Sequence, residues 1–531
     1  METTQRYDVV VAGGGVAGLT AAAYCAKAGL RTLVCERADK PGGLVGTFTR
    51  AGFSFDAGIR AFEDSSVITP MLRSLGSSLE FVKNPVTIGI GSRSVRLLDR
   101  SSLHDYANLF KSFFPDQAAA IDGIAVQIET VMRYMDVLYG AENPLFLDRE
   151  LRDPKYLAGT LLPWLLDYSV NMRKAARLDA PVRQYLRRFT QSEPLIDMIC
   201  QHFFADTPTF FALSYFGLYL DYRYPVGGTG QLPLRLAEIF SAQGGTLLTG
   251  ADIVGVSPAT RTAALADGRT FRYGQLIWAA DQTALYRALG EPLPKAARRQ
   301  KALVERSRGI DSILTLYLGT GISPAEAEAA CGAHAFYTPV ADGFSSLPDW
   351  RTLRCDGTEA LRRWTVSYLE TTTYELSIPA LRDPALAPAG KTGWIASTLF
   401  DYELAKFFAD SGEYESFKSL ATKTILRVLG ASLLPGLTEK IEYSFCATPL
   451  TIERETGARH GAITGWAYTN RPIPAVHDFK KLRQAIRTGL PDVLQCGMWT
   501  FSPAGLPVSI ITGKLAADEA ARRLKRRGAR A

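Results

Sequence analysis

The sequence lacks the features that mark a membrane-spanning protein. Among its 531 residues there is no run of about 20 apolar residues, the length that a helix needs to cross a bilayer. The two most apolar segments, residues 160–170 and 203–220, each contain Asp and Pro. Their length favours helices buried in a large core. The alternatives are the wall of an apolar tunnel and a face that docks on one leaflet of a membrane.

Cysteine and histidine are scarce and scattered. The seven cysteines include no CxxC pair, which argues against a zinc site and a disulfide framework and indicates a reducing compartment. The five histidines form no metal-ligand pattern, so we expect no bound metal. The chain enters a β-branched run at Tyr7, which leaves no room for a secretion signal. These features predict a cytoplasmic protein, free or at the cytoplasmic membrane surface.

No large excess of charge of one sign is present. The chain has 60 Lys and Arg against 53 Asp and Glu, a formal charge of +7, and residues 522–530 alone supply six positive charges. A solvated helix end is the simpler interpretation of this tail, and attraction to anionic lipid headgroups is the sharper one. No nucleic-acid-binding module accompanies it, so we expect no nucleic-acid partner.

Length and composition predict a globular protein of more than one domain. Hydrophobic residues make up 47% of the chain and charged residues 21%, as in ordinary globular proteins. A single core stops growing at roughly 250–300 residues, well below this length. Because no repeat or low-complexity linker divides the chain, we expect two interleaved domains.

The first forty residues contain a dinucleotide-binding pattern. A β-branched run at residues 7–12 leads into Gly13-Gly-Gly-Val-Ala-Gly18, and an Ala-rich helical segment follows. In such a turn Gly13 permits the tight bend, Gly15 lets backbone amides approach a pyrophosphate, and Gly18 lets the helix pack closely on the strand. Glu36 ends the next strand, where a carboxylate can accept hydrogen bonds from ribose hydroxyls. Strand, turn, helix and acid occur in the order that the pattern requires.

A second pair of glycines favours FAD over NAD. The pattern E-x5-GG-x3-T-x4-G-x3-D-x-G runs from Glu36 to Gly58. It resembles the doublet-glycine region of the flavin amine oxidase and phytoene desaturase superfamily. The resemblance implies that this segment, with Gly42 and Gly43, wraps the FAD pyrophosphate and the flavin. Where the family usually has a basic residue after the glycine pair, this chain has Leu44, so one phosphate contact is missing or is supplied elsewhere.

Later stretches extend the resemblance to the branch of phytoene desaturases, carotenoid isomerases and retinol saturases. They lie at residues 223–230, 383–390 and 494–507. The last leads into a helix expected from about Ile510, whose positive N-terminal end would favour the anionic reduced flavin. The glycine pattern and the resemblance together assign to the cofactor Gly13, Gly15, Val16, Ala17, Gly18, Glu36, Arg37, Gly42, Gly43, Leu44, Val254, Gly497, Gly505, Leu506, Val508 and Ser509.

The resemblance also implies an α/β fold of the amine-oxidase type. A Rossmann-like FAD-binding domain would be interleaved with an α+β substrate domain that contains a mixed sheet and helices. The FAD-binding domain would comprise residues 1–90, 224–295 and 485–531, and the substrate domain residues 95–223 and 296–484. In the second domain, alternating apolar residues at 312–318 and 364–368 indicate strands, and helical spacing at 118–138 indicates a helix.

The resemblance implies an FAD-dependent oxidoreductase that desaturates, saturates or isomerises carbon–carbon double bonds of an apolar lipid. Two alternatives stay open: an amine-oxidase-like enzyme that acts on a polar small molecule, and a lipid-binding escort protein of the same fold without redox activity. His202, beside an aromatic cluster, and Glu375, in a family landmark, are weak candidates for a catalytic acid or base. The partners expected are an apolar substrate and a membrane surface, with oligomeric state open.

Overall fold

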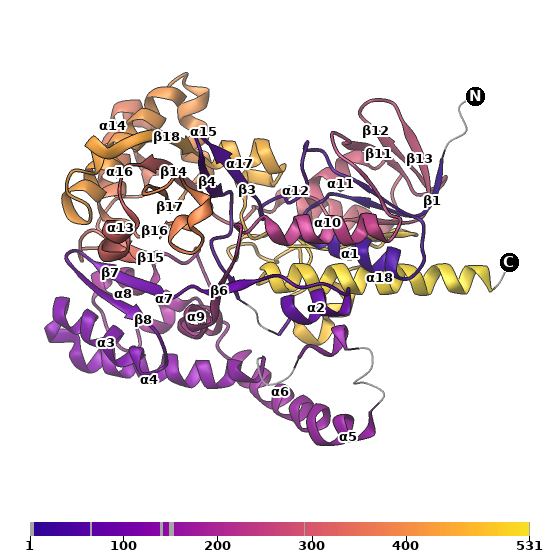
Figure 1. The fold of residues 1–531 in the computed structure, drawn as a ribbon, viewed down its shortest axis with the longest axis horizontal. Helices are drawn as coiled ribbons and strands as arrows, with labels where there is room; N and C mark the ends of the chain where they lie inside the picture. The colour runs from indigo at the N-terminus through magenta and orange to yellow at the C-terminus, as the bar shows by residue number, and fades with distance from the viewer. Residues whose placement is uncertain (1–4, 64–65, 139–141, 148–152, 291, 530–531) are drawn as a thin grey trace.

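Two seven-stranded sheets form the centres of the molecule (Figure 1). The computed structural model describes residues 5–63, 66–138, 142–147, 153–290 and 292–529. The first sheet lies towards the two chain ends in Figure 1, and the second lies on the opposite side, beside a layer of helices. Segments far apart in the sequence contribute to each sheet, so the chain crosses between the two halves several times.

The first sheet is the dinucleotide-binding half. Its strand order is β10-β2-β1-β13-β12-β11, and β19 pairs with β13. The pairs β10/β2, β2/β1, β1/β13 and β13/β19 are parallel, and β11, β12 and β13 form an antiparallel meander. The strands are β1 (Arg6–Ala12), β2 (Thr32–Cys35), β10 (Thr246–Leu248), β11 (Ile253–Ser257), β12 (Thr262–Leu265), β13 (Thr270–Trp278) and β19 (Val493–Gln495).

The second sheet is mixed, with β15 and β7 parallel and the other pairs antiparallel. Its order is β18-β14-β17-β16-β15-β7-β8. The strands are β7 (Val86–Ile90), β8 (Arg93–Leu97), β14 (Ser312–Thr320), β15 (His334–Thr338), β16 (Tyr374–Ser377), β17 (Thr392–Phe400) and β18 (Ile441–Ala447).

Side chains of the second sheet alternate between a packed core and a cavity. Leu314, Leu316 and Leu318 of β14 belong to a buried cluster with helices α14 (Thr358–Thr371) and α16 (Tyr414–Ser432). Thr315 and Tyr317, on the opposite face, line a large cavity. This alternation follows from the two-residue period of a strand. One face of the sheet therefore stabilises the fold while the other is available for ligands.

Helices cover both sheets. α1 (Val16–Lys27) packs on α18 (Leu506–Gly528) so closely that a Cβ on Gly513 would lie 2.5 Å from the Ala17 carbonyl oxygen. The other helices are α2 (Ile68–Ser74), α3 (Ser102–Phe113), α4 (Ala118–Met135), α5 (Pro154–Tyr156), α6 (Leu162–Ala175), α7 (Val182–Leu186), α8 (Glu193–Cys200), α9 (Thr209–Asp221), α10 (Gln231–Ala242), α11 (Gln282–Ala288), α12 (Lys295–Arg306), α13 (Pro324–Cys331), α14 (Thr358–Thr371), α15 (Tyr402–Asp410), α16 (Tyr414–Ser432) and α17 (Pro449–Thr456).

Short strands carry the chain between the two halves. β3 (Thr47–Arg50) and β4 (Phe53–Asp56) form a hairpin. β9 (Tyr222–Pro225) pairs with both β5 (Phe62–Glu63) and β6 (Phe81–Lys83) in a three-stranded sheet. The hairpin packs Phe53 and Phe55 against the second sheet, which ties the two halves together.

Two details differ from the sequence-based expectation. β7 pairs with β15 of the second sheet, although its residues fall in the range 1–90 that we assigned to the FAD-binding domain. Residues 364–368, expected as a strand, lie inside α14. The physical reason is that Leu361, Thr365 and Leu369 recur at helical spacing and are all buried. Across the described residues, no helix is both long enough and apolar enough to cross a membrane.

Candidate functional site

A cavity of about 3300 Å³ lies against both sheets. Its lining begins at the glycine turn after β1 and reaches the inward face of the second sheet and helix α9. Ligand pockets commonly measure about 300–1,000 Å³, so this space can hold a dinucleotide and a second large ligand together.

The glycine turn forms one end of the cavity. Gly13 has φ +102°, a conformation that favours glycine, and a Cβ on Gly18 would lie 2.0 Å from the Gly13 carbonyl oxygen. Gly15 precedes the first residue of α1, and no side chain caps this helix end. The amides of the first turn therefore remain available to an anion in the cavity. Gly13, Gly15, Val16 and Ala17 all line it.

Glu36 lies at the end of β2, against the same turn. Its Oε2 accepts a hydrogen bond from the Gly14 amide at 2.6 Å, and its Oε1 accepts one from the Ala38 amide at 2.8 Å. These bonds hold the carboxylate at the cavity wall, with further lone pairs free to accept from a ribose. Arg37 also lines the cavity and donates to the backbone carbonyl oxygens of Arg454 and Glu455.

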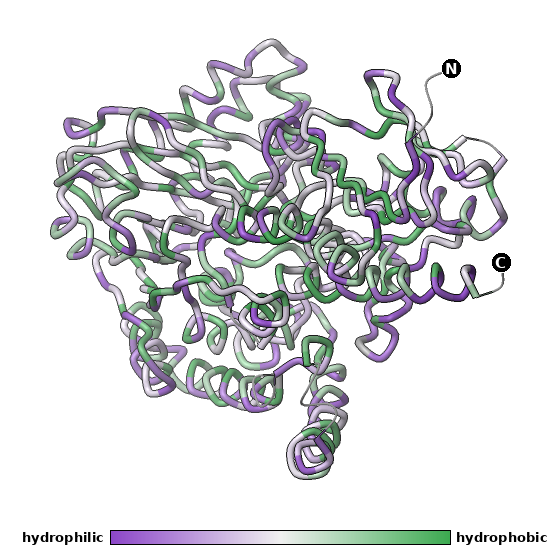
Figure 2. The backbone as a smooth tube through the Cα atoms, turned by 45° about the vertical axis from the view of Figure 1, so that its right-hand side comes forward, coloured by the Kyte–Doolittle hydropathy of each residue, from purple (hydrophilic) through white to green (hydrophobic). Residues whose placement is uncertain are grey.

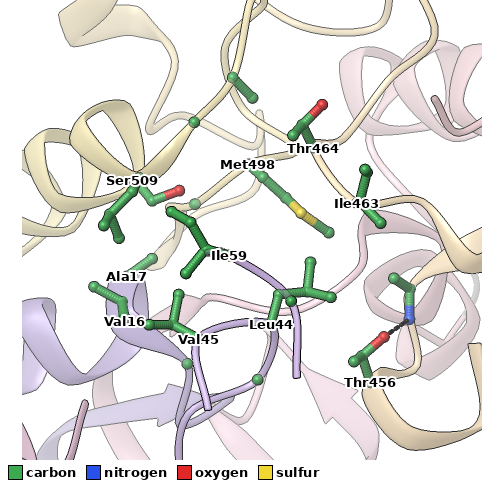
Figure 3. A pocket seen from close by; sticks show the side chains of 18 of the residues that line it. Val16, Ala17, Leu44, Val45, Ile59, Thr456, Ile463, Thr464, Met498 and Ser509 are labelled. Atoms are coloured by element: carbon green, nitrogen blue, oxygen red, sulfur yellow. Dashed lines mark hydrogen bonds between the residues drawn. The ribbon is translucent and has the colours of Figure 1, made fainter. Parts of the chain in front are cut away.

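The second glycine pair faces the first. Gly15 forms a bridge with Gly42, and Gly42, Gly43 and Leu44 line the cavity. In Figure 3, Leu44 and Val45 approach the same space as Val16 and Ala17 of α1. The basic contact that the family usually has after this pair is replaced here by an aliphatic side chain. Other basic residues line the cavity elsewhere, Lys40, Arg50, Arg287 and Lys514 among them.

The stretch at residues 494–507 places the N-terminus of a second helix at the cavity. α18 begins at Leu506, four residues before the expected start, and Gly505 precedes it without a capping side chain. Gly497, Gly505, Leu506, Val508 and Ser509 line the cavity, and Figure 3 shows Ser509 and Met498 beside Ala17 and Ile59. The N-termini of α1 and α18 thus provide two positive dipole ends for a negatively charged ligand.

Gly18 and Val254 are the expected cofactor residues outside the cavity lining; the resemblance gives Val254 a contact through its backbone, which stays a prediction. The Val254 side chain is 51% exposed and is not part of the cavity lining. The wall at this strand is formed by Ala251, Asp252 and Ile253. Because successive side chains of β11 alternate in direction, Ile253 is buried and Val254 points to solvent.

The residues at this end of the cavity fit FAD. A Cβ on Gly15 would meet no protein atom closer than 4.0 Å, so it would project into the space that a pyrophosphate has to enter. Thr464 Oγ1 is buried and lacks a hydrogen-bond partner among the described residues, and it lies at the cavity wall (Figure 3). A polar cofactor edge would supply that partner.

The far part of the cavity has an aromatic wall. Phe210, Phe211, Tyr215 and Leu218 of α9 line it, together with Phe336 of β15. His202 lies in this wall, and its Nε2 is 3.0 Å from the Tyr219 hydroxyl. Burial lowers the pKa of His202 to about 4, so the ring is neutral near pH 7. A neutral imidazole already bonded to a tyrosine is a poor catalytic acid.

Glu375 lies in the cavity wall together with a residue that sequence reasoning missed. Its Oε1 is 3.0 Å from Nε2 of His334 on the neighbouring strand. His334 is 1% exposed, whereas 32% of the Glu375 side chain is exposed, towards the cavity that it lines. No local signal predicted this pair, because 41 residues separate its members and only the register of β15 and β16 brings them together.

Buried arginines stand behind this wall. Arg60 donates to Ser397 Oγ at 3.1 Å and to the Asp56 carbonyl oxygen. Arg382 lies over the Tyr224 ring, 3.8 Å from its centroid, and donates to Ser377 Oγ at 2.6 Å. Both side chains are almost fully buried. The buried Asp56 carboxylate accepts hydrogen bonds from the hydroxyl groups of Thr47, Tyr224 and Thr229 and from the Thr229 amide.

Relatives of known name resemble most of the chain. It is 27% identical to prolycopene isomerase of Arabidopsis thaliana, over 84% of this chain and 72% of that protein. It is 25% identical to phytoene dehydrogenase of Streptomyces griseus, over 96% and 94%. It is 22% identical to all-trans-retinol 13,14-reductase of Danio rerio, over 86% and 77%.

Solved structures share the fold. An oxidoreductase from Methanosarcina mazei matches with a TM-score of 0.61 and 14% identity, over 97% of this chain and 99% of that one. Cyclohexylamine oxidase from Brevibacterium oxydans matches with a TM-score of 0.60 and 14% identity, over 98% and 100%. The predicted α/β, two-domain fold of the amine-oxidase type is confirmed.

A family model described as flavin containing amine oxidoreductase matches residues 16–320, which is more than half of the chain. This match confirms the resemblance that the glycine patterns indicated. Because the residues at the turn also fit a dinucleotide, the cofactor is FAD. The protein belongs to the family of flavin-containing amine oxidoreductases.

Proposed function

We propose that the protein is an FAD-dependent oxidoreductase that desaturates, saturates or isomerises carbon–carbon double bonds of an apolar lipid of the carotenoid, retinoid or isoprenoid kind. The observation that carries the proposal is the continuity of the cavity. One space of about 3300 Å³ joins the glycine turn to the aromatic wall of α9. A lipid that enters along the aromatic side chains can therefore reach the flavin.

The relatives support this substrate class. Their names are those of an isomerase, a dehydrogenase and a reductase, of prolycopene, phytoene and all-trans-retinol respectively. Bound FAD supplies the hydride-accepting and hydride-donating chemistry. The task of the chain is to hold the lipid within about 3–3.5 Å of the reacting flavin atom and to exclude water. The apolar lining on α9 suits that task.

An anaerobic spectroscopic titration tests the proposal. Purified holoprotein, oxidised or chemically reduced, is mixed with polyenes, retinoids and isoprenoid lipids, and with small amines as the alternative substrate class. We expect a lipid to bleach the oxidised flavin, to reoxidise the reduced flavin, or to emerge isomerised. Bleaching of the oxidised flavin by amines alone would show that the protein acts as an amine oxidase. A protein that takes up no FAD would favour the escort alternative.

The exposed apolar side chains of residues 157–170 support docking on a membrane. Residues 157–170 form one π-helical turn and most of α6, and they project from the body of the molecule in Figure 1. Figure 2 shows apolar residues mixed with polar ones there. The exposed large hydrophobic side chains in this segment are Leu157, Leu162, Leu165, Leu166 and Val170.

This segment also connects the membrane to the cavity. Trp164, Leu165 and Tyr168 line the cavity, next to the exposed leucines. Arg173 and Lys174 follow at the end of α6, where they can contact anionic headgroups. The proposed occupant of this surface is a lipid leaflet, from which an apolar substrate enters beside Trp164.

The basic tail, residues 522–530, offers fewer free positive charges for membrane binding than its composition suggested. Arg522 and Arg523 pair with Glu519, and Arg527 pairs with Asp492. Three of the six basic residues in the tail therefore form ion pairs within the protein. The apolar segment, rather than the tail, carries the proposed membrane contact, and the cytoplasmic location stays a prediction.

A further inference from the structure

A chain of hydrogen bonds runs from a buried cation to the cavity wall. Arg382 Nη1 donates to Asn84 Oδ1 at 3.2 Å. Asn84 Nδ2 is 3.0 Å from His334 Nδ1, and His334 Nε2 is 3.0 Å from Glu375 Oε1. Arg382, Asn84 and His334 are buried, and Glu375 is the acidic member of the chain and lines the cavity.

The first link determines the direction of all the others. A guanidinium can only donate, so the oxygen of the Asn84 amide has to face Arg382. The Asn84 NH2 group then faces His334 Nδ1 and donates to it, which leaves the His334 proton on Nε2. That proton is donated to Glu375 Oε1. The four residues therefore hold Glu375 as the acceptor at the end of the chain.

The surrounding charges support the ionised form of Glu375. Burial acts to raise its pKa, but the hydrogen bond from His334, with the charges of Arg60 and Arg382, outweighs it and lowers the pKa below the ordinary value. Burial also lowers the pKa of His334. His202, whose ring centroid lies 5.3 Å from that of Phe336, is neutral near pH 7. Tyr215, Tyr219 and Tyr222 have raised pKa values because they are buried, so none of them competes as an anion.

Glu375 is placed to meet a substrate. It lies in register with Phe336 on one side and Ser397 on the other, and all three line the cavity. Its second oxygen, Oε2, has no hydrogen-bond partner among the described residues. Tyr222 stacks on His334 with ring centroids 5.6 Å apart and an interplanar angle of 7°, which fixes the imidazole from the side.

We infer that Glu375 is the base that removes a proton from the lipid when a double bond forms, and that Arg382, Asn84 and His334 position it. This inference rests on the proposed function. Forming one double bond removes two hydrogens from adjacent carbons. One leaves as hydride, with both electrons of its C–H bond, to oxidised FAD. The other leaves as a proton to Glu375, and the electron pair of its C–H bond becomes the π bond.

The same chain prepares Glu375 for the step that forms a double bond. Proton removal needs the carboxylate, which the hydrogen bond from His334 and the nearby arginines stabilise. Glu375 is protonated after the step.

Glu375→Gln tests the role of the carboxylate. The amide keeps the shape and can still accept from His334, but it cannot take a proton. We expect the rate of flavin reduction by a lipid substrate to fall by about 100-fold or more, with FAD content and lipid binding unchanged. The matched control is Glu370→Gln, near the end of α14 and outside the cavity lining, where the carboxylate pairs with Arg427.

Glu63 is the competing carboxyl group. It lines the cavity, and burial, followed by the charge of Asp221, raises its pKa to about 7. If Glu63→Gln abolishes flavin reduction by the lipid while Glu375→Gln does not, the assignment of the base to Glu375 is overturned.

The pH profile tests the positioning residues. His334→Phe keeps the stack with Tyr222 but removes the donor to Glu375, so we expect the acid limb of kcat/KM to move to higher pH. His334→Gln retains a donor and should move the limb less. A merely structural role would lower stability or FAD content in both variants and leave the limb in place, which would overturn the positioning chain.

Infrared spectroscopy separates a failure of this inference from a failure of the proposed function. The carboxyl band of Glu375, identified by difference from Glu375→Gln, is titrated in the holoprotein without substrate. We expect it to appear at higher pH in His334→Phe than in the unmodified protein. If no lipid reacts but this shift occurs, the proposed substrate class is wrong, and the hydrogen-bonded coupling of His334 to Glu375 is supported. If lipids react and the shift is absent, the positioning chain fails.

Discussion

The exposed leucines of α6 allow the proposed membrane contact to be tested quantitatively. Leu162 is 57% exposed and Leu166 is 62% exposed. Full burial of a leucine side chain is worth about 1.5–3 kcal/mol, so burying the exposed part of both in a bilayer is worth about 3 kcal/mol. Leu162→Gln combined with Leu166→Gln should therefore weaken partition into vesicles about 100-fold. Glutamine has nearly the helix propensity of leucine, so folding should hardly change.

The matched control uses two equally exposed residues elsewhere. Leu98 is 66% exposed and Val126 is 55% exposed, and both lie outside residues 157–170. Flotation of each double variant with phosphatidylcholine vesicles, with and without anionic lipid, measures the partition coefficient. We expect the α6 variant to lose binding and the control to retain it. Equal binding by both variants and the unmodified protein would refute the docking surface.

Two further predictions concern the cofactor turn and His202. Gly18→Val places a Cβ 2.0 Å from the Gly13 carbonyl oxygen, so we expect protein without FAD, measured as the ratio of flavin to protein absorbance. Gly159→Ala, whose Cβ would meet nothing within 4 Å, is its control and should keep full occupancy. Because burial lowers the pKa of His202 to about 4, the unfolded chain binds a proton below about pH 6.5 that the folded protein does not. The free energy of unfolding, measured by urea denaturation, should therefore fall as pH drops from 6.5 towards 4. His202→Phe should make this fall less steep. An unchanged dependence on pH in the variant would contradict the neutral buried ring.

The dinucleotide half was largely predictable from the sequence because its signals are local. A β-branched strand, a turn that needs glycine and an Ala-rich helix follow one another within residues 7–29, and their geometry depends on neighbours in the chain. The direction of a side chain on β11 was less predictable, because the pleat of the strand buries Ile253 and exposes Val254.

The substrate half was harder to predict because its structure depends on tertiary packing. Residues 364–368 are rich in β-branched and aromatic residues, yet burial of Leu361, Thr365 and Leu369 on one face makes the segment helical. The positioning chain could not be found from the sequence at all. Asn84 and His334 are 250 residues apart, and they meet because β7 and β15 pair in parallel.

The most direct test of the central claim is the stoichiometry of a single anaerobic turnover. Holoprotein with oxidised FAD is mixed with an excess of a saturated or partly saturated isoprenoid lipid, the flavin spectrum is followed, and the lipid is analysed by mass spectrometry. The account predicts one new double bond, and a loss of two hydrogens, for each FAD reduced. Flavin reduction without a new double bond would contradict it, and so would a panel in which no lipid reduces oxidised FAD, reoxidises reduced FAD or emerges isomerised.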